Sequence, residues 1–167
     1  MDEKSLIKQA MRGDKDAFAA LYERYKDDLY RYAFFRLGNA EDAKDAVSSC
    51  VIAAYEGIYS LRAASAFKSW IFKILFYSCG KLIASQQEQR SRGDISELDR
   101  IPSQEDRLSP EIQEALTALG YPDKDIVLLG VVAGYNSKEI ASMLGLNANT
   151  VRSRQSRALA KMKAFLG

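Results

Sequence analysis

The residues best suited to a chemical role lie near the C-terminus, in a run of basic side chains. After Asn149 the charged residues are all cationic: Arg152, Arg154, Arg157, Lys161 and Lys163. A helix with a purely cationic face suits DNA, because phosphates supply much of the affinity of DNA-binding proteins. Arg152 and Arg157 are the leading candidates, because an arginine can bind guanine O6 and N7 through two hydrogen bonds.

The neighbouring polar residues extend this candidate surface. Ser153 and Ser156 fall on the same side of the predicted helix as Arg152 and Arg157, and we predict base-edge or phosphate contacts for all four. Thr150 and Arg154 are predicted to contact the DNA backbone. A helical hairpin whose basic face is simply solvated is the alternative reading of the same pattern.

The segment that positions these residues has the form of a helix-turn-helix, reading GYNSKEIASMLGLNANTVRSRQSRAL over 134–159. Ser137 is predicted to cap its first helix, Gly145 to end that helix in the left-handed conformation, and Asn147 to cap the second. Four residues are predicted to form the apolar back of the second helix: Val151, Ala158, Met162 and Phe165.

Composition argues against an enzyme. The 167 residues contain no histidine, which removes Ser-His and Cys-His chemistry and the commonest metal ligand. Cys50 and Cys79 lack metal-ligand spacing and fall within apolar helical patterns, so we expect both to be buried. There is no glycine-rich phosphate loop. We therefore expect no cofactor, no metal and no small-molecule substrate.

The remaining totals indicate a cytoplasmic protein. No apolar run reaches membrane-spanning length and the segment MDEKSLIKQA is polar, so we expect no membrane insertion. The net charge of +2 is too small to predict a nucleic-acid partner by itself. The case for DNA therefore depends on local charge.

Hydrophobic periodicity predicts an all-α fold with two domains. Helical patterns fill residues 1–85, with Asp14 or Asp16 and then Asn39 as helix caps, a loop over 60–65, and a fourth helix after it. Residues 86–110 are polar and contain proline and glycine, which is typical of a flexible linker. Residues 111–167 form the second domain, in which Asp123 is predicted to cap a helix.

The order of these parts resembles the sigma factors of bacterial RNA polymerase, of the small extracytoplasmic-function (ECF) type. Residues 14–47 (DKDAFAALYERYKDDLYRYAFFRLGNAEDAKDAV) look like the start of region 2 of that family, and AFKSWIFKI over 66–74 looks like its promoter-melting segment. Residues 134–159 look like region 4. The resemblance covers nearly the whole chain.

The resemblance implies a transcription initiation factor that binds core RNA polymerase and promoter DNA, and commonly an anti-sigma protein. The positions matching the polymerase-binding helix are Asp42, Asp45, Ser48 and Ser49. The positions matching the −10 element contacts are Ser60, Arg62, Phe67, Lys68, Trp70 and Lys73. Aromatic rings stack on exposed bases and lysines hold phosphates, although Phe67 and Trp70 also lie on the apolar stripe of their helix. Region 4 would read the −35 element.

Some positions depart from the family pattern. Ser48 and Ser49 stand where the family has a glutamine and an acid, and 73–77 reads KILFY where the family has a run like RIARN. The family's aspartate and trailing basic residues become Lys81, Ala84 and Ser85, and Gln155 fills a slot usually held by leucine. Two alternatives therefore stay open: a free-standing helix-turn-helix regulator, or a sigma-like polymerase-binding protein without full initiation activity.

Overall fold

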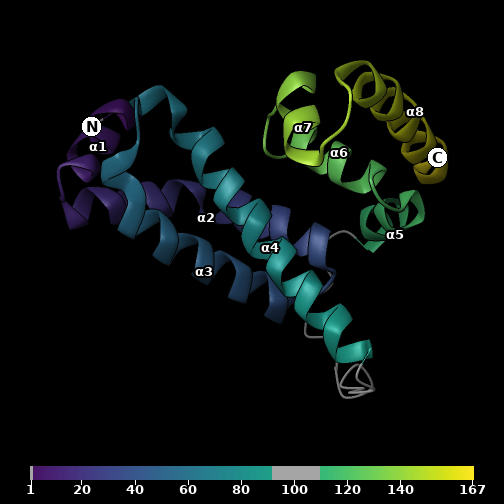
Figure 1. The fold of residues 1–167 in the computed structure, drawn as a ribbon, viewed down its shortest axis with the longest axis horizontal. Coiled ribbons are helices and arrows are strands. Elements are labelled where there is room, and N and C mark those ends of the chain that lie inside the picture. The colour runs from purple at the N-terminus through teal and green to yellow at the C-terminus, as the bar shows by residue number, and fades with distance from the viewer. Residues whose placement is uncertain (1, 92–109) are drawn as a thin grey trace. The chain divides into compact units, whose positions relative to one another are not determined.

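The computed structural model describes residues 2–91 and 110–167, which fall into two compact units, one on each side of the intervening segment. Every regular element in these two ranges is a helix (Figure 1), which confirms the all-α prediction. The first unit contains α1 (Glu3–Met11), α2 (Lys15–Leu37), α3 (Ala40–Gly57), the short 3-10 helices η1 (Ile58–Ser60) and η2 (Ala64–Ala66), and α4 (Phe67–Ser91). The second contains α5 (Pro110–Leu119), α6 (Asp123–Val131), α7 (Ser137–Leu144) and α8 (Ala148–Leu166).

The first unit is a bundle in which α3 packs along both α2 and α4, and α1 packs against α2 (Figure 1). The turn between α2 and α3 is set by local chemistry. Gly38 ends α2 with a φ of 86°, and the Asn39 side chain caps α3 by accepting a hydrogen bond from the Asp42 backbone N–H at 2.8 Å. The core of the bundle includes Leu21, Leu29, Tyr32, Ala43, Ile71, Phe72 and Leu75, all at most 2% exposed.

Two predicted boundaries in this unit differ from the structure. The predicted loop over 60–65 is shorter in the structure, because η1 includes its first residue and η2 includes its last two. Helix α4 continues to Ser91 and so occupies the first residues of the predicted linker, 86–110. The linker residues 92–109 lie outside the described residues.

In the second unit, α5, α6 and α7 all pack against α8. Apolar side chains from each helix meet there: Leu116, Ile126, Leu129, Ile140, Val151 and Ala158, none more than 1% exposed. Asp123 is the first residue of α6 and Pro122 occupies the cap position, so the predicted Asp123 cap is wrong by one residue. The packing fixes α8 on its apolar side and leaves the opposite side exposed.

Both cysteines are completely buried in the first unit, as predicted. The Cys50 Sγ lies 3.5 Å from the Ile71 carbonyl oxygen, and burial, assisted by Cys79, raises the pKa of the Cys50 thiol to about 12. That thiol is therefore protonated at neutral pH and unreactive.

Among the described helices, none combines the length and apolar character needed to cross a bilayer. Residues 2–91 and 110–167 also contain no cluster of side chains that could hold a metal ion.

Candidate nucleic-acid interface

The helix-turn-helix is held in shape by two caps and a glycine. Asn136, not Ser137, caps α7: its side chain accepts from the Glu139 N–H and the Glu139 carboxylate accepts from the Asn136 N–H, each at 2.9 Å. This capping box satisfies two helix-end donors at once, which a serine one residue later does not. Gly145 ends α7 with a φ of 69°, and Asn147 caps α8, both as predicted.

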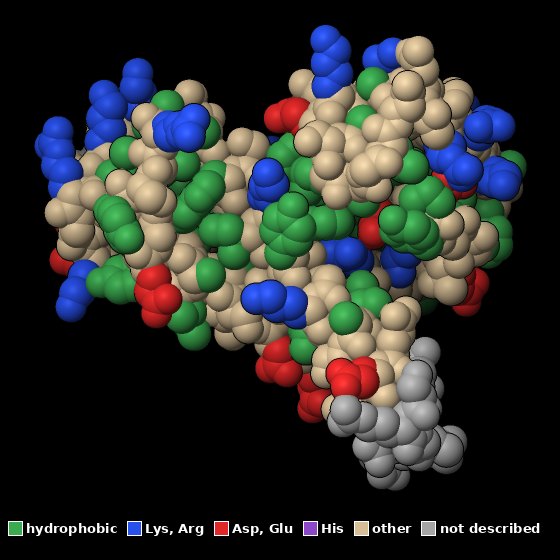
Figure 2. Space-filling view, in the orientation of Figure 1, with side chains coloured by type: hydrophobic (Ala, Val, Ile, Leu, Met, Phe, Trp, Pro, Cys, Tyr) green, Lys and Arg blue, Asp and Glu red, His purple; other side chains and the backbone are tan. Residues whose placement is uncertain are grey.

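The exposed side of α8 carries the predicted DNA-reading residues. Arg152, Ser153, Ser156 and Arg157 are all exposed, while Val151 and Ala158 on the opposite side are buried. Figure 2 shows Lys and Arg side chains gathered over α8. The Arg152 guanidinium donates to the Asn149 side-chain oxygen, and the Arg157 Nε donates to the Ser153 carbonyl oxygen at 3.3 Å. Both guanidinium groups are therefore oriented along the outer surface of the helix.

Arg154 and Thr150 are placed differently from these four residues. The Arg154 Nη1 lies 3.2 Å from an Asp123 carboxylate oxygen, so this ion pair ties α8 to the start of α6. Thr150 is half-buried, and its carbonyl oxygen accepts from the Ser153 hydroxyl at 3.2 Å. Arg154 thus has a structural partner within the unit, in addition to the backbone contact predicted for it.

The apolar back of α8 is shorter than the sequence predicts. Met162 is half-buried and Phe165 is 54% exposed, so the prediction that Phe165 packs inward is wrong. The other helices of the unit do not cover the end of α8. Gln155 is half-buried and lies against Gly130 of α6, where a β-carbon at position 130 would overlap its amide. Because Gly130 has no side chain, it leaves space for the polar side chain of Gln155 between α8 and α6.

In the first unit, the predicted −10 residues divide between surface and core. Ser60, Arg62, Lys68 and Lys73 are exposed, and Trp70 is half-buried. Phe67 is only 1% exposed, and its ring meets the Tyr25 ring edge-on at 5.3 Å. The prediction of a DNA contact for Phe67 is therefore corrected, because its ring is used to pack the start of α4 against α2. The competing expectation, that Phe67 belongs to the apolar stripe, holds.

The four predicted polymerase-binding positions on α3 also divide. Asp45, Ser48 and Ser49 are exposed on the outer side of the helix. Asp42 is 8% exposed, and its Oδ2 accepts from the Asn39 amide at 2.7 Å and from the Gln86 amide at 2.5 Å. Asp42 therefore joins α3 to the last turns of α4. Because it is buried, the prediction that places it on the polymerase-binding surface is corrected.

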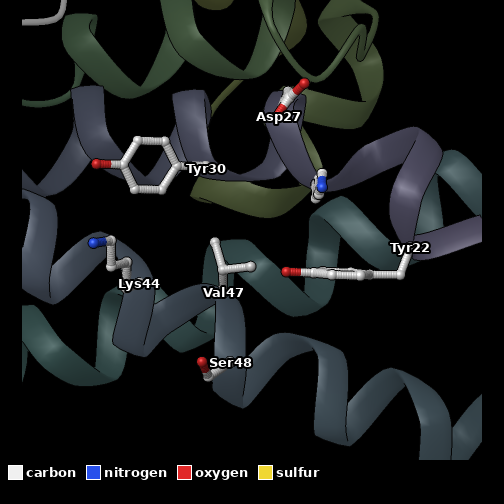
Figure 3. A pocket seen from close by; sticks show the side chains of 7 residues that line it. Tyr22, Asp27, Tyr30, Lys44, Val47 and Ser48 are labelled. Carbon is white, nitrogen blue, oxygen red and sulfur yellow. The ribbon is translucent and has the colours of Figure 1, made fainter. Parts of the chain in front are cut away.

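Ser48 also borders an open hollow between α2 and α3 of about 340 Å³ (Figure 3). Residues at one-turn spacing on each helix line this hollow: Tyr22, Lys26, Asp27 and Tyr30 from α2, and Lys44, Val47 and Ser48 from α3. A longer side chain at position 48 would project toward this space. Where the family has a glutamine, Ser48 thus removes bulk and an amide from the outer side of α3, and Ser49 beside it removes the charge of the family's acid.

A pair of substitutions separates the two aspartates of α3. Asp42→Ala is expected to lower the free energy of unfolding by about 1–3 kcal/mol, because the Asn39 and Gln86 amides lose their acceptor. The exposed Asp45→Ala should change it by no more than about 0.5 kcal/mol. Urea unfolding followed by circular dichroism measures both. Equal effects of the two substitutions would contradict the structural role of Asp42.

Several residues that position this surface were not identified from the sequence. The Asn149 side chain accepts a hydrogen bond from the Arg152 guanidinium. Side chains three residues apart lie side by side on a helix, so the spacing of these two residues is a signal from which the contact could have been predicted. Asn136 caps α7 in place of the predicted Ser137. The signal for Asn136 is Glu139, which occupies the third helical position of a capping box that begins at Asn136. Gln86 lies 44 residues from Asp42 and has no local signal.

Comparison with known proteins assigns both units to one family. Residues 21–88 match the family model described as Sigma-70 region 2, and residues 109–162 match the model described as Sigma-70, region 4. The chain is 32% identical over 143 residues to the RNA polymerase sigma factor SigV of Bacillus subtilis, covering 85% of this chain and 86% of that protein. It is 30% identical over 165 residues to the ECF RNA polymerase sigma factor SigM of Mycobacterium tuberculosis, covering 97% and 83% respectively.

Two solved structures share the fold. One is CnrH in complex with the cytosolic domain of CnrY, with a TM-score of 0.68 and 23% identity, covering 98% of this chain and 96% of CnrH. The other is the sigma factor RpoE in complex with the anti-sigma factor NepR from Bartonella quintana, with a TM-score of 0.67 and 24% identity, covering 92% and 98%. At these identities the likeness shows the fold alone.

Proposed function

The chain belongs to the ECF sigma factors, which direct RNA polymerase to promoters through regions 2 and 4, and we propose on this premise a division of labour between its two units. The second unit reads the −35 element with α8. The first unit binds core polymerase with α3 and opens the −10 element with α4 and the segment before it. Sigma factors are not enzymes, and this function needs no cofactor.

The exposed cationic side of α8 is the observation that carries the −35 assignment. Arg152 and Arg157 project from a helix that is packed on its other side, and no acid follows them. We assign base-edge contacts to these two arginines, with Ser153 and Ser156 beside them. Thr150 and Arg154 flank the surface and are assigned to the DNA backbone, with Arg154 shared between phosphate and Asp123.

In the first unit we assign the −10 contacts to the exposed residues of the predicted set. Lys68 and Lys73 bind phosphates, Ser60 and Arg62 border the unstacked base, and the half-buried Trp70 offers part of its ring. Polymerase binding is assigned to the outer side of α3 at Asp45, Ser48 and Ser49. Asp45→Ala is therefore expected to weaken polymerase binding more than Asp42→Ala does, if the folded fractions are matched.

We further propose the two predicted domains, 1–85 and 111–167, as the functional division of the chain. Because α4 continues to Ser91, the first domain includes the first residues of the predicted linker, 86–110. A factor that works with RNA polymerase acts in the cytoplasm, which is where we place it. CnrH and RpoE of Bartonella quintana were each solved with a second protein bound, CnrY and the anti-sigma factor NepR. On this basis we propose an anti-sigma factor as a partner of this chain as well.

Run-off transcription from fragmented genomic DNA of the source organism tests this proposal. Purified core polymerase is used with and without the protein, and the transcripts are sequenced. We expect new start sites that share one asymmetric, two-part upstream motif. Polymerase binding without new start sites would identify a sigma-like protein that lacks initiation activity. Failure to bind polymerase, with stable binding to palindromic DNA by the protein alone, would favour a free-standing regulator.

A further inference from the structure

The hollow between α2 and α3 has a hydroxyl group at its edge and two cations among the residues that line it. Ser48 is exposed and borders the hollow, and Lys26 of α2 and Lys44 of α3 also line it. Lys44 precedes Ser48 by four residues, so the two side chains lie one turn apart on the same side of α3 (Figure 3). The hollow therefore brings one modifiable hydroxyl together with two lysines.

The charge of this hollow differs from what the family pattern predicts for the neighbouring surface. Its charged residues are Lys26, Lys44 and Asp27, which sum to +1, and Figure 3 shows the Asp27 side chain directed away from Ser48. The family has a glutamine and an acid where this chain has Ser48 and Ser49. The chain thus has a cationic hollow beside the position at which the family carries a negative charge.

A phosphate group on Ser48 matches this hollow in size and in charge. The hollow has a volume of about 340 Å³, roughly ten times the volume of a water molecule in the liquid. A phosphoserine carries a charge of about −1.5 to −2 at pH 7 and three acceptor oxygens, and lysines bind phosphate as point charges. The Tyr22 hydroxyl points toward Val47 in Figure 3 and is a further donor at the same hollow.

The present partner of Lys26 does not prevent this interaction. The Lys26 Nζ lies 2.8 Å from a Glu23 carboxylate oxygen, and both side chains of this ion pair are exposed. Exposed ion pairs contribute little to stability, because water screens the attraction and two long side chains must be ordered. A phosphate with a charge near −2 therefore competes well for Lys26.

The neighbouring serine lacks such an environment. Ser49 has Asp45 four residues before it and Ala53 four residues after it, and it does not line the hollow. A phosphate on Ser49 would meet a like charge one turn away, which is unfavourable on a helix. Of the two adjacent serines, Ser48 is the one whose surroundings favour a phosphate.

We propose that Ser48 is a phosphorylation site, at which a phosphate held by Lys26 and Lys44 restores negative charge to the polymerase-binding side of α3. A serine kinase transfers the γ-phosphoryl group of ATP. The bond from the Ser48 Oγ to phosphorus forms, the bond from phosphorus to the β-phosphate oxygen breaks, ADP leaves, and the hydroxyl proton passes to the kinase. This inference rests on the proposed function and deepens it, because phosphorylation then controls when the first unit binds polymerase.

The phosphate site is tested first with the full chain alone. Phosphoserine is incorporated during translation at position 48, and at position 49 as the matched control, and the phosphate is titrated by phosphorus NMR. The second pKa of phosphoserine is ordinarily about 6. We expect the pKa at position 48 to lie about 0.5 or more below that at position 49, because lysines favour the dianion and Asp45 opposes it. Lys44→Gln should raise the value at position 48. Equal pKa values at the two positions would overturn the proposal.

The effect on polymerase is measured as the affinity of each form for core polymerase. The chain with phosphoserine at position 48 should bind about 10-fold more tightly than the unmodified chain, the gain from one charge-assisted hydrogen bond. Ser48→Glu and Ser48→Gln are a matched pair of equal length that differ in charge, and the glutamate variant should bind more tightly. Equal binding by the modified and unmodified chains contradicts the proposal. If no form binds polymerase, the proposed function fails, and the NMR titration still decides whether the hollow holds the phosphate.

Mass spectrometry of the protein isolated from its own cells tests whether the modification occurs. Trypsin cleaves after Lys44 and Arg62, so one peptide carries Ser48, Ser49 and Ser60, and its fragment ions distinguish the three serines. We expect phosphate at Ser48 under conditions in which the promoters found by run-off transcription are active. Phosphate only at Ser49 or Ser60, or an unmodified peptide under those conditions, would show that Ser48 is not the site.

Discussion

Arg152→Ala is expected to reduce transcription from the cognate promoter about 10- to 100-fold. A well-placed arginine contributes about 1–3 kcal/mol of discrimination at the base it contacts, and Arg152 is exposed on the side of α8 that faces away from the core of its unit. The guanidinium is already oriented by its hydrogen bond to Asn149. Run-off transcription with reconstituted polymerase measures the loss, and a panel of promoters with single base changes shows at which position the specificity relaxes.

Two further variants distinguish base reading from general charge. Lys163→Ala removes an exposed cation from the far end of the same helix and should lower transcription only slightly, without changing base preference. Asn149→Ala leaves the charge of Arg152 in place and removes its orienting acceptor, so its effect should fall between the other two. Equal losses for Arg152→Ala and Lys163→Ala, with base preference intact, would contradict the assignment of base reading to Arg152.

Phe67→Ala should have the largest effect on stability. The side chain is 1% exposed and packs edge-on against Tyr25, and deleting a buried phenylalanine side chain costs about 3–5 kcal/mol. We expect the free energy of unfolding of the first unit to fall by that amount. Chemical denaturation of the full chain, followed by the near-ultraviolet signal of Trp70, reports on this unit alone, because Trp70 is the only tryptophan.

Phe67→Leu separates packing from DNA contact. Leucine fills most of the space of the phenylalanine ring, so this variant should stay folded at a cost of about 1–2 kcal/mol and should open promoters at nearly the parental rate. A DNA-stacking role predicts the opposite result, with intact stability and a large loss of promoter opening. Such an outcome would return Phe67 to the −10 surface.

Features that depend on neighbouring residues could be predicted from the sequence. Gly145 ends a helix and Asn39 and Asn147 begin helices as predicted, because a left-handed glycine and an asparagine cap each act within a few residues of the chain. The exposure of Arg152 and Arg157 likewise followed from helical periodicity. The cap of α7 was misplaced by one residue because two adjacent side chains could both serve, and the reciprocal bond from Glu139 decided between them.

Features that depend on distant residues could not be predicted. The sequence shows the same acidic pattern for both aspartates at the start of α3, yet Asp45 is exposed and Asp42 is buried. The difference comes from Gln86, which is 44 residues from Asp42 in the sequence but donates a hydrogen bond to it. Phe165 continues the period of Val151 and Ala158, but among the described residues no neighbouring helix covers it, and it is 54% exposed. Periodicity identifies an apolar side, and tertiary packing decides how much of it is covered.

The uneven packing of α8 has a consequence for its local unfolding. The half of the helix that carries Arg152 and Arg157 also carries the buried Val151 and Ala158, whereas the last turn ends in the exposed Phe165 and Leu166. Opening the first half breaks tertiary contacts, while the last turn can fray without breaking any burial. Backbone amides between 151 and 158 should therefore exchange with deuterium far more slowly than those near 165. The segment assigned to DNA keeps its shape before any DNA is bound, and the loose end of the helix is free to adapt to another surface.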